Sequence, residues 1–122
     1  MENGQVNFVL LRHKREGQAD HYDLMFDLEP PKGLLRTFSI FESLESIKRP
    51  GQVVCKQIFD HERRFLDYEG SVNNGAGNVV QIDKGLADIL SETPFRFRLA
   101  GAIVKGDFVM NGEGYLVHVD VN

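Results

Sequence analysis

Short apolar segments rich in Val, Phe, Leu and Ile alternate with glycine, proline and polar residues along the whole sequence. This rhythm is typical of β-strands separated by turns. We expect strands at residues 5–12, 21–28, 34–41, 52–59, 79–82, 95–99, 102–110 and 114–121. Single helical turns are expected within 42–51 and at 85–91, and the glycine-rich stretch 62–78 is expected to be a structured loop.

Many short strands with little helix favour a small antiparallel barrel or a sandwich. The chain of 122 residues is long enough for one core, and we expect a single domain over residues 1–122. Asn111 and Gly112 favour a tight hairpin between the last two strands. The predicted class is mainly β: a compact single-domain antiparallel β-barrel with short helical turns, because closure removes exposed strand edges.

Segment 21–28, HYDLMFDL, has the alternation of an amphipathic strand. Its even positions, Tyr22 to Leu28, are apolar and predict a core face, whereas the odd positions carry His21, Asp23, Met25 and Asp27. An imidazole and a carboxylate two residues apart on one face can reach a single divalent ion. The sequence therefore predicts half of a metal site, although a simple solvated pair is also compatible with the pattern.

His13 ends the preceding apolar strand, and the polar run 14–20 connects it to segment 21–28. An antiparallel hairpin of these two strands would bring His13 back beside His21. The pattern thus supplies a third candidate ligand.

Composition narrows the class of protein. The formal charge of −4 argues against strong non-specific binding of a nucleic acid backbone, and basic clusters such as Arg63–Arg64 are interpreted as solvated faces. The lone cysteine, Cys55, lies in an apolar run and fits a small buried side chain in a reducing compartment. The first residues do not resemble a signal peptide, and no segment is long enough to span a bilayer. We expect a cytoplasmic protein without a membrane partner.

An ordered set of short motifs extends these observations. The set comprises RH at 12–13, HYD at 21–23, DH at 60–61, YEG at 68–70, GAG at 75–77 and ID-x-G at 82–85, followed by Leu99, Gly101, Lys105 and Gly106. In order and spacing it resembles the 3′-phosphoesterase domain of the DNA ligase D family, from about residue 8 to residue 110.

The resemblance implies a β-barrel that holds a divalent metal, typically Mn²⁺ with Zn²⁺ or Co²⁺ as alternatives, through His13, His21 and Asp23. It implies that His61 contacts the phosphate, and His61 with the three metal ligands would form the catalytic set. A bound metal and a titratable imidazole suit hydrolysis of a phosphate monoester. The implied activity is removal of a 3′-phosphate or 3′-ribonucleotide from DNA or DNA/RNA primer ends in repair, beside a ligase or polymerase. A loop-capping role for His61 remains the alternative.

Departures from the family pattern concern the substrate side. Met25, Phe59, Phe65 and Glu42 stand where the family has, in turn, an arginine, a glutamate, a tyrosine and part of a tryptophan-containing strand leading into Pro-Lys-Gly. Two cations near the phosphate are thus lost, and the candidate substitutes are Arg12, Arg36 and Lys56. The alternative function is a relative that binds nucleic acid ends, a phosphate compound or a repair partner without turnover.

Overall fold

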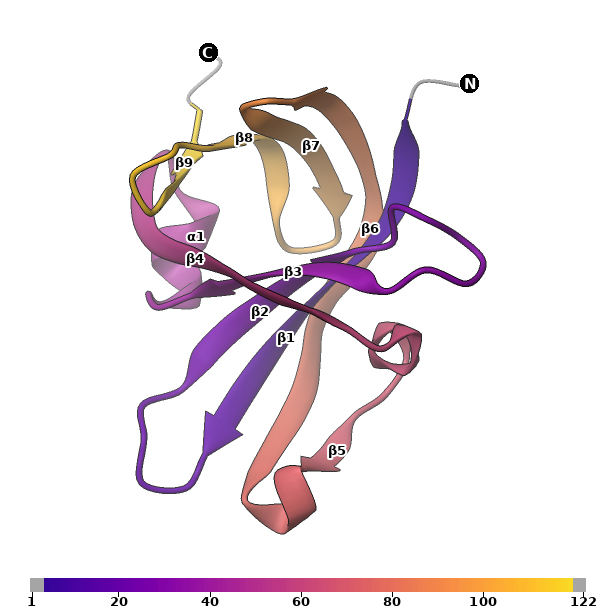
Figure 1. Cartoon of the computed structure of the whole chain (residues 1–122). Coiled ribbons are helices and arrows are strands. Elements are labelled where there is room, and N and C mark those ends of the chain that lie inside the picture. Colours follow the sequence, from indigo (N-terminus) through magenta and orange to yellow (C-terminus); the bar gives the residue numbers. More distant parts are fainter. Residues whose placement is uncertain (1–3, 120–122) are drawn as a thin grey trace.

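Alternating apolar and polar residues give rise to nine strands in the computed structural model, which describes residues 4–119 (Figure 1). The strands are β1 (Gln5–Arg15), β2 (His21–Phe26), β3 (Leu35–Ile40), β4 (Gly51–His61), β5 (Gly70–Val72), β6 (Gly77–Glu92), β7 (Phe95–Gly101), β8 (Lys105–Met110) and β9 (Tyr115–His118). The helical elements are α1 (Leu44–Lys48) and the 3₁₀ turns η1 (Arg63–Leu66) and η2 (Asn73–Gly75).

The sheet closes on itself. Its strand order is β1-β2-β3-β4-β9-β8-β7-β6-β5, and β1 also pairs with β6. The result is an antiparallel barrel of eight strands, with β5 added alongside the first residues of β6. The predicted mainly β barrel is confirmed, and the sandwich is excluded. The helical turn predicted within 42–51 is also confirmed as α1, with Ser43 as its N-cap.

β1 and β2 form the predicted hairpin, which projects at the lower left of Figure 1. Their register pairs Phe8 with Phe26 and ends with His13 opposite His21. The same hairpin edge is completed by β6, which pairs with β1 from Gln5 to Arg15. The two histidines are therefore brought together by backbone pairing.

Both faces of the hairpin are buried. The even positions, including Phe8, Leu10, Leu24 and Phe26, belong to the main core. A second apolar cluster on the odd face consists of Val9, Leu11, Met25, Leu35, Phe65 and Val79. The predicted core face is confirmed, and the alternative of a solvated His21–Asp23 pair is wrong, because η1 and the strands that flank it cover the odd face as well. Met25 is a fully buried packing residue of this second cluster.

The predicted helical turn at 85–91 is wrong. These residues belong to β6, a 16-residue strand that pairs with β1 on one side and with β7 on the other. Register shifts between Leu10 and Leu11 and between Ile89 and Ser91 accommodate its bending. The predicted loop 62–78 contains η1, β5, η2 and the first residues of β6.

Asp83 of the D-x-G motif and Gly101 of the L-x-G motif have a structural role in the fold. Its buried carboxylate accepts backbone hydrogen bonds from Lys84, Ala102, Ile103 and Val104 at 2.7–3.0 Å. A Cβ on Gly101 would lie only 2.2 Å from Asp83 Oδ2, so the site requires glycine. Asp83 and Gly101 therefore stabilise the turn between β7 and β8.

A second buried carboxylate positions η1. Arg63 donates to both oxygens of Asp27 at 2.6 and 2.7 Å and to the carbonyl of Gly33 at 3.0 Å. The hydrogen bonds to Asp27 raise the pKa of Arg63. This ion pair ties η1 to the end of β2 and thereby holds the residues that follow Arg63 over the odd face of the hairpin.

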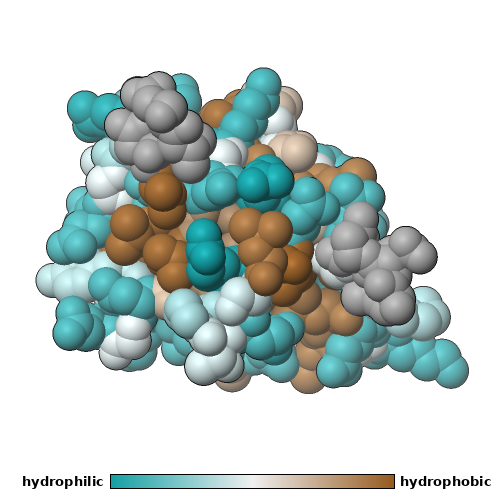
Figure 2. Space-filling model, turned by 90° about the horizontal axis from the view of Figure 1, so that it is seen from above, coloured by the Kyte–Doolittle hydropathy of each residue, from teal (hydrophilic) through white to brown (hydrophobic). Residues whose placement is uncertain are grey.

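The upper end of the barrel, seen in Figure 2, has apolar side chains gathered at its centre and polar side chains around them. The Asn111-Gly112 hairpin joins β8 to β9, as predicted. Residues 120 and 121, the end of the last predicted strand, lie outside the described residues.

Candidate metal centre

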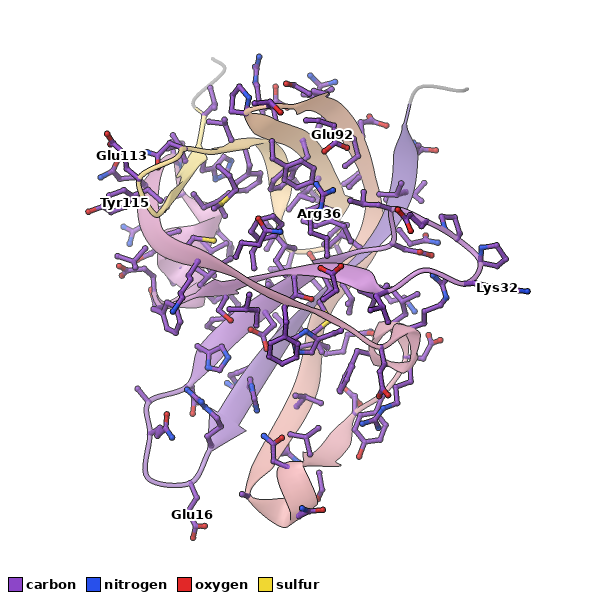
Figure 3. The ribbon with its side chains drawn as sticks, viewed as in Figure 1. Glu16, Lys32, Arg36, Glu92, Glu113 and Tyr115 are labelled. Carbon is purple, nitrogen blue, oxygen red and sulfur yellow. The ribbon has the colours of Figure 1, made fainter. Side chains whose placement is uncertain are left out.

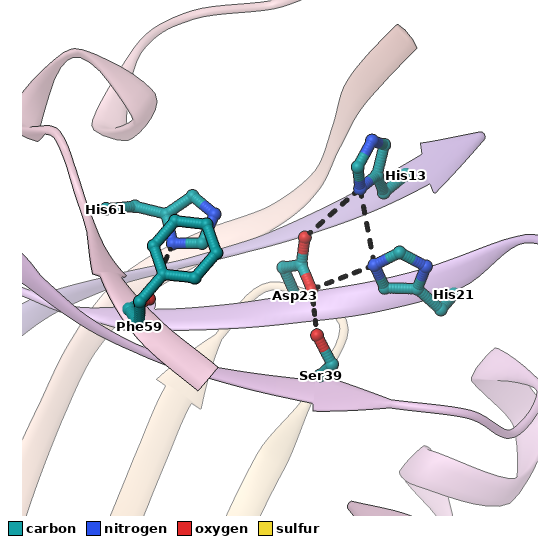
Figure 4. Close-up of polar contacts among 6 residues, drawn as sticks. All are labelled: His13, His21, Asp23, Ser39, Phe59 and His61. Atoms are coloured by element: carbon teal, nitrogen blue, oxygen red, sulfur yellow. Dashed lines mark hydrogen bonds and ion pairs between the residues drawn. The ribbon is translucent and has the colours of Figure 1, made fainter. Parts of the chain in front are cut away.

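Three side chains from the β1–β2 hairpin converge on the odd face of the sheet (Figure 4). His13 Nδ1 lies 3.3 Å from His21 Nε2 and 3.5 Å from Asp23 Oδ2, and His21 Nε2 lies 3.2 Å from Asp23 Oδ1. Each separation is between atoms that can ligate a metal. Backbone register brings the three together: His13 and His21 are paired across the strands, and Asp23 is two residues further along the same face.

One ligand atom from each of the three residues lies within 4.8 Å of the other two, which is close enough for a shared ion. Donors at about 2.0–2.1 Å from a tetrahedral centre stand about 3.3–3.4 Å apart, and the two imidazole nitrogens are 3.3 Å apart. Two imidazoles and a carboxylate also form a donor set that transition metals accept with positions left over for water or substrate. His13, His21 and Asp23 are therefore a possible metal-binding triad.

Asp23 is held ionised. Burial by itself would raise the pKa of its carboxyl, but hydrogen bonds from His13, His21 and Ser39 outweigh burial and hold the pKa well below its usual range. Ser39 Oγ, on the neighbouring strand β3, donates to Asp23 Oδ1 at 2.7 Å, and both residues are buried. An ionised carboxylate in a buried position favours a bound cation.

The outer nitrogens of both imidazoles are buried. His13 Nε2 and His21 Nδ1 have no hydrogen-bond partner among residues 4–119. Gly77 explains the setting of His13, because a Cβ at this glycine would lie 3.2 Å from His13 Nε2. The GAG motif thus has a role beyond its turn: Gly77 makes room for the imidazole, while Gly75 has a φ of +90° that suits glycine.

His61 ends β4 and faces the triad across a cavity of about 260 Å³. The cavity is lined by His13, Asp23, Met25, Phe59, Asp60, His61, Glu62, Arg64, Phe65, Val72, Asn73 and Val79. His61 Nδ1 lies 3.0 Å from the backbone carbonyl of Phe59. A carbonyl only accepts, so Nδ1 carries a proton and donates it, and Nε2 is the ring nitrogen that remains for a ligand.

Acidic groups outnumber basic ones around the cavity. Asp23, Asp60 and Glu62 face it, whereas Arg64 is the guanidinium among the described lining residues. Arg64 Nε donates to Glu62 at 2.8 Å. The balance favours a cation, and an anionic substrate would need a metal to offset the carboxylates.

The remaining predicted residues are not brought to this cavity. Arg36 points to the upper half of the barrel, where it donates to Glu92 at 3.1 Å and lies over the ring of Phe95 (Figure 3). It occupies an even position on β3, opposite in face to Ser39. Arg12 likewise alternates with His13 and pairs with Tyr22, away from the triad.

Lys56 is exposed and pairs with Ser39 across the strands. Glu42 is also exposed and follows Phe41, whose ring centroid lies 5.6 Å from that of His21. Neither Lys56 nor Glu42 is among the cavity residues in the part of the chain that the structure describes. Candidate phosphate contacts in the cavity are therefore His61 and Arg64.

No family model and no curated protein matches this chain. Among the described residues, no helix has the length and apolarity to cross a membrane.

Sequence patterns did not reveal several residues of the site. Ser39 lies 16 residues beyond Asp23 on another strand, and its hydroxyl carried no signal. Arg64 belonged to a basic pair that was interpreted as a solvated face. Its position three residues after the DH motif was the feature that could have indicated a place in the site. Phe59 and Phe65 were noted only as departures, yet both rings contact His61.

Proposed function

We propose that the chain is a metal-dependent phosphoesterase that acts on the 3′ ends of nucleic acids. The observation that carries the proposal is the convergence of His13, His21 and Asp23, two of which, His13 and Asp23, line a cavity that His61 also lines. The motif resemblance to the ligase D 3′-phosphoesterase supplies the substrate: a 3′-phosphate or 3′-ribonucleotide on DNA or a DNA/RNA primer. Mn²⁺ is the proposed ion, and the donor set also suits Zn²⁺ or Co²⁺.

When bound, a divalent ion neutralises phosphate charge and promotes ionisation of water at neutral pH. His13, His21 and Asp23 would hold that ion. His61 would hold a proton at Nε2 and give it to the leaving 3′-oxygen as the phosphorus–oxygen bond breaks, so water adds across the ester to yield phosphate and a 3′-hydroxyl. The Phe59 carbonyl keeps the Nδ1 proton in place throughout this exchange.

The second candidate function is binding of the same end without turnover. It is favoured by the charge balance, since three carboxylates face one guanidinium in the cavity and Arg12 and Arg36 lie elsewhere. A ligase or polymerase would use the processed or bound end. Because Cys55 is a buried free thiol, we also propose the reducing cytoplasm as the compartment.

The decisive experiment combines metal titration with product release. Metal-stripped protein is titrated with Mn²⁺, Zn²⁺ and Co²⁺ by calorimetry, and phosphate release is measured on an oligonucleotide with a 3′-phosphate. We expect His21→Ala to abolish both signals. The matched control is His118→Ala, because His118 contacts Phe108 and the Ile47 carbonyl instead. Metal binding without release would support the binding function, and absence of metal binding in the wild type would refute both.

A further inference from the structure

Phe59 is an aromatic side chain left in solvent at the edge of the site. It is 76% exposed and lines the same cavity as His13, Asp23 and His61. Its ring lies parallel to the His61 imidazole, with centroids 4.7 Å apart and an interplanar angle of 9° (Figure 4). One face of the ring is covered by His61, and most of the remaining surface is open to water.

Core packing does not account for this exposure. Phe59 belongs to neither apolar cluster. Phe65, whose ring centroid lies 5.6 Å from that of His61, is by contrast buried in the second cluster. An exposed aromatic ring in a cavity wall is more informative than one scattered on a surface, because its burial can be supplied only by a ligand.

Arg64 and Phe65 line the same cavity, and Tyr68 lies next to Arg64. The guanidinium of Arg64 lies 4.6 Å from the centroid of Phe65 and 4.9 Å from that of Tyr68. The side chain is 54% exposed and is steadied by Glu62. The exposed ring of Phe59 and the exposed guanidinium of Arg64 thus line one cavity. An exposed ring and an arginine are a combination with which proteins bind unpaired nucleobases, since each base has a face that stacks.

The cavity is large enough for only part of a nucleotide. About 260 Å³ is slightly below the range of about 300–1,000 Å³ for sites that enclose a drug-sized ligand. It suits a phosphate with part of its sugar, and the base is left outside, where the open face of Phe59 lies. Because carboxylates dominate the cavity, affinity for the anion is weak without metal and stacking has to contribute.

We propose that Phe59 is a specificity-determining residue that stacks against an unpaired terminal nucleobase, with Arg64 as a cation in the lining of the same cavity. The inference rests on the proposed function for the phosphate and adds the substrate class: a phosphate carried by a nucleoside with a free base, in preference to one without a base.

The test compares two single-stranded oligonucleotides with a 3′-phosphate, one ending in a normal nucleotide and one in an abasic residue. Binding is measured by fluorescence anisotropy with Mn²⁺ present, and phosphate release is followed separately. We expect the wild type to bind the normal end about 5- to 150-fold more tightly. Phe59→Ala removes this preference and leaves abasic binding unchanged, whereas Phe59→Trp retains it. Val54→Ala is the matched control, because Val54 is an exposed apolar residue of the same strand outside the cavity lining.

Each result separates the two proposals. Base preference without phosphate release supports stacking and refutes the phosphoesterase. Release without base preference supports the phosphoesterase and overturns stacking. Stacking is also overturned if Phe59→Ala weakens both oligonucleotides equally, or if the wild type binds neither.

Discussion

Ser39 offers a direct measure of how the fold supports the candidate metal centre. Its hydroxyl donates to Asp23 Oδ1 at 2.7 Å, and both residues are buried. Ser39→Ala removes this donor and little volume. A hydrogen bond to an ionised group contributes about 1.5–3 kcal/mol, so the metal-free variant should be less stable by about that amount. Loss of a side chain that orients a ligand lowers metal affinity by about 10–100-fold, which is roughly 1.4–2.8 kcal/mol on the same scale.

The assay pairs urea unfolding in the presence of EDTA with calorimetric titration of Mn²⁺. Thr37→Val is the matched control. Thr37 is a buried residue on the same face of β3, and its hydroxyl donates to the Leu35 carbonyl and not to Asp23. It should lose stability and keep the wild-type metal affinity. The reasoning is refuted if Ser39→Ala binds metal as the wild type does, or if Thr37→Val weakens binding equally.

Three further changes test other parts of the structure. The pKa of Asp23 is held below its ordinary value of 3.8, so its contribution to stability is present above that pH and is lost on further acidification. Asp23→Asn should therefore make the free energy of unfolding less dependent on pH below about pH 4. Urea titration at several pH values measures this dependence. Asp83→Ala leaves buried N–H groups without an acceptor and should cost at least about 3 kcal/mol by the same method, and a smaller loss would contradict the capping role. Gly77→Ala should displace His13 and weaken metal binding, whereas Gly112→Ala, in open space, should leave titration curves unchanged.

Local patterns predicted those features that depend on neighbours in the chain. The β1–β2 hairpin follows from two alternating segments and one polar connection, and it places His13 opposite His21. The triad could therefore be predicted, since all its members lie in this hairpin. The closed barrel followed from the number of short strands, although the pairing of β1 with β6 carried no local signal.

Other features depend on pairings across the barrel. Leu86, Ile89 and Leu90 have a helical spacing, yet backbone pairing with β1 and β7 keeps β6 extended over its whole length. A solvated pair on the odd face of the hairpin stayed open as an alternative because nothing in segment 21–28 indicates that η1 packs over it. The Asp27–Arg63 pair that holds η1 there joins residues 36 positions apart.

The confinement of all three donors to one hairpin has a consequence for folding. Hairpins form within about 1–10 µs, well before a barrel of non-local pairings closes. An ion able to bridge His13, His21 and Asp23 would select the register that pairs the two histidines over a register shifted by one residue, which would turn Asp23 to the opposite face. It would also bind chains that are still incompletely folded, so added metal would raise the stability of the native barrel by less than its affinity alone implies.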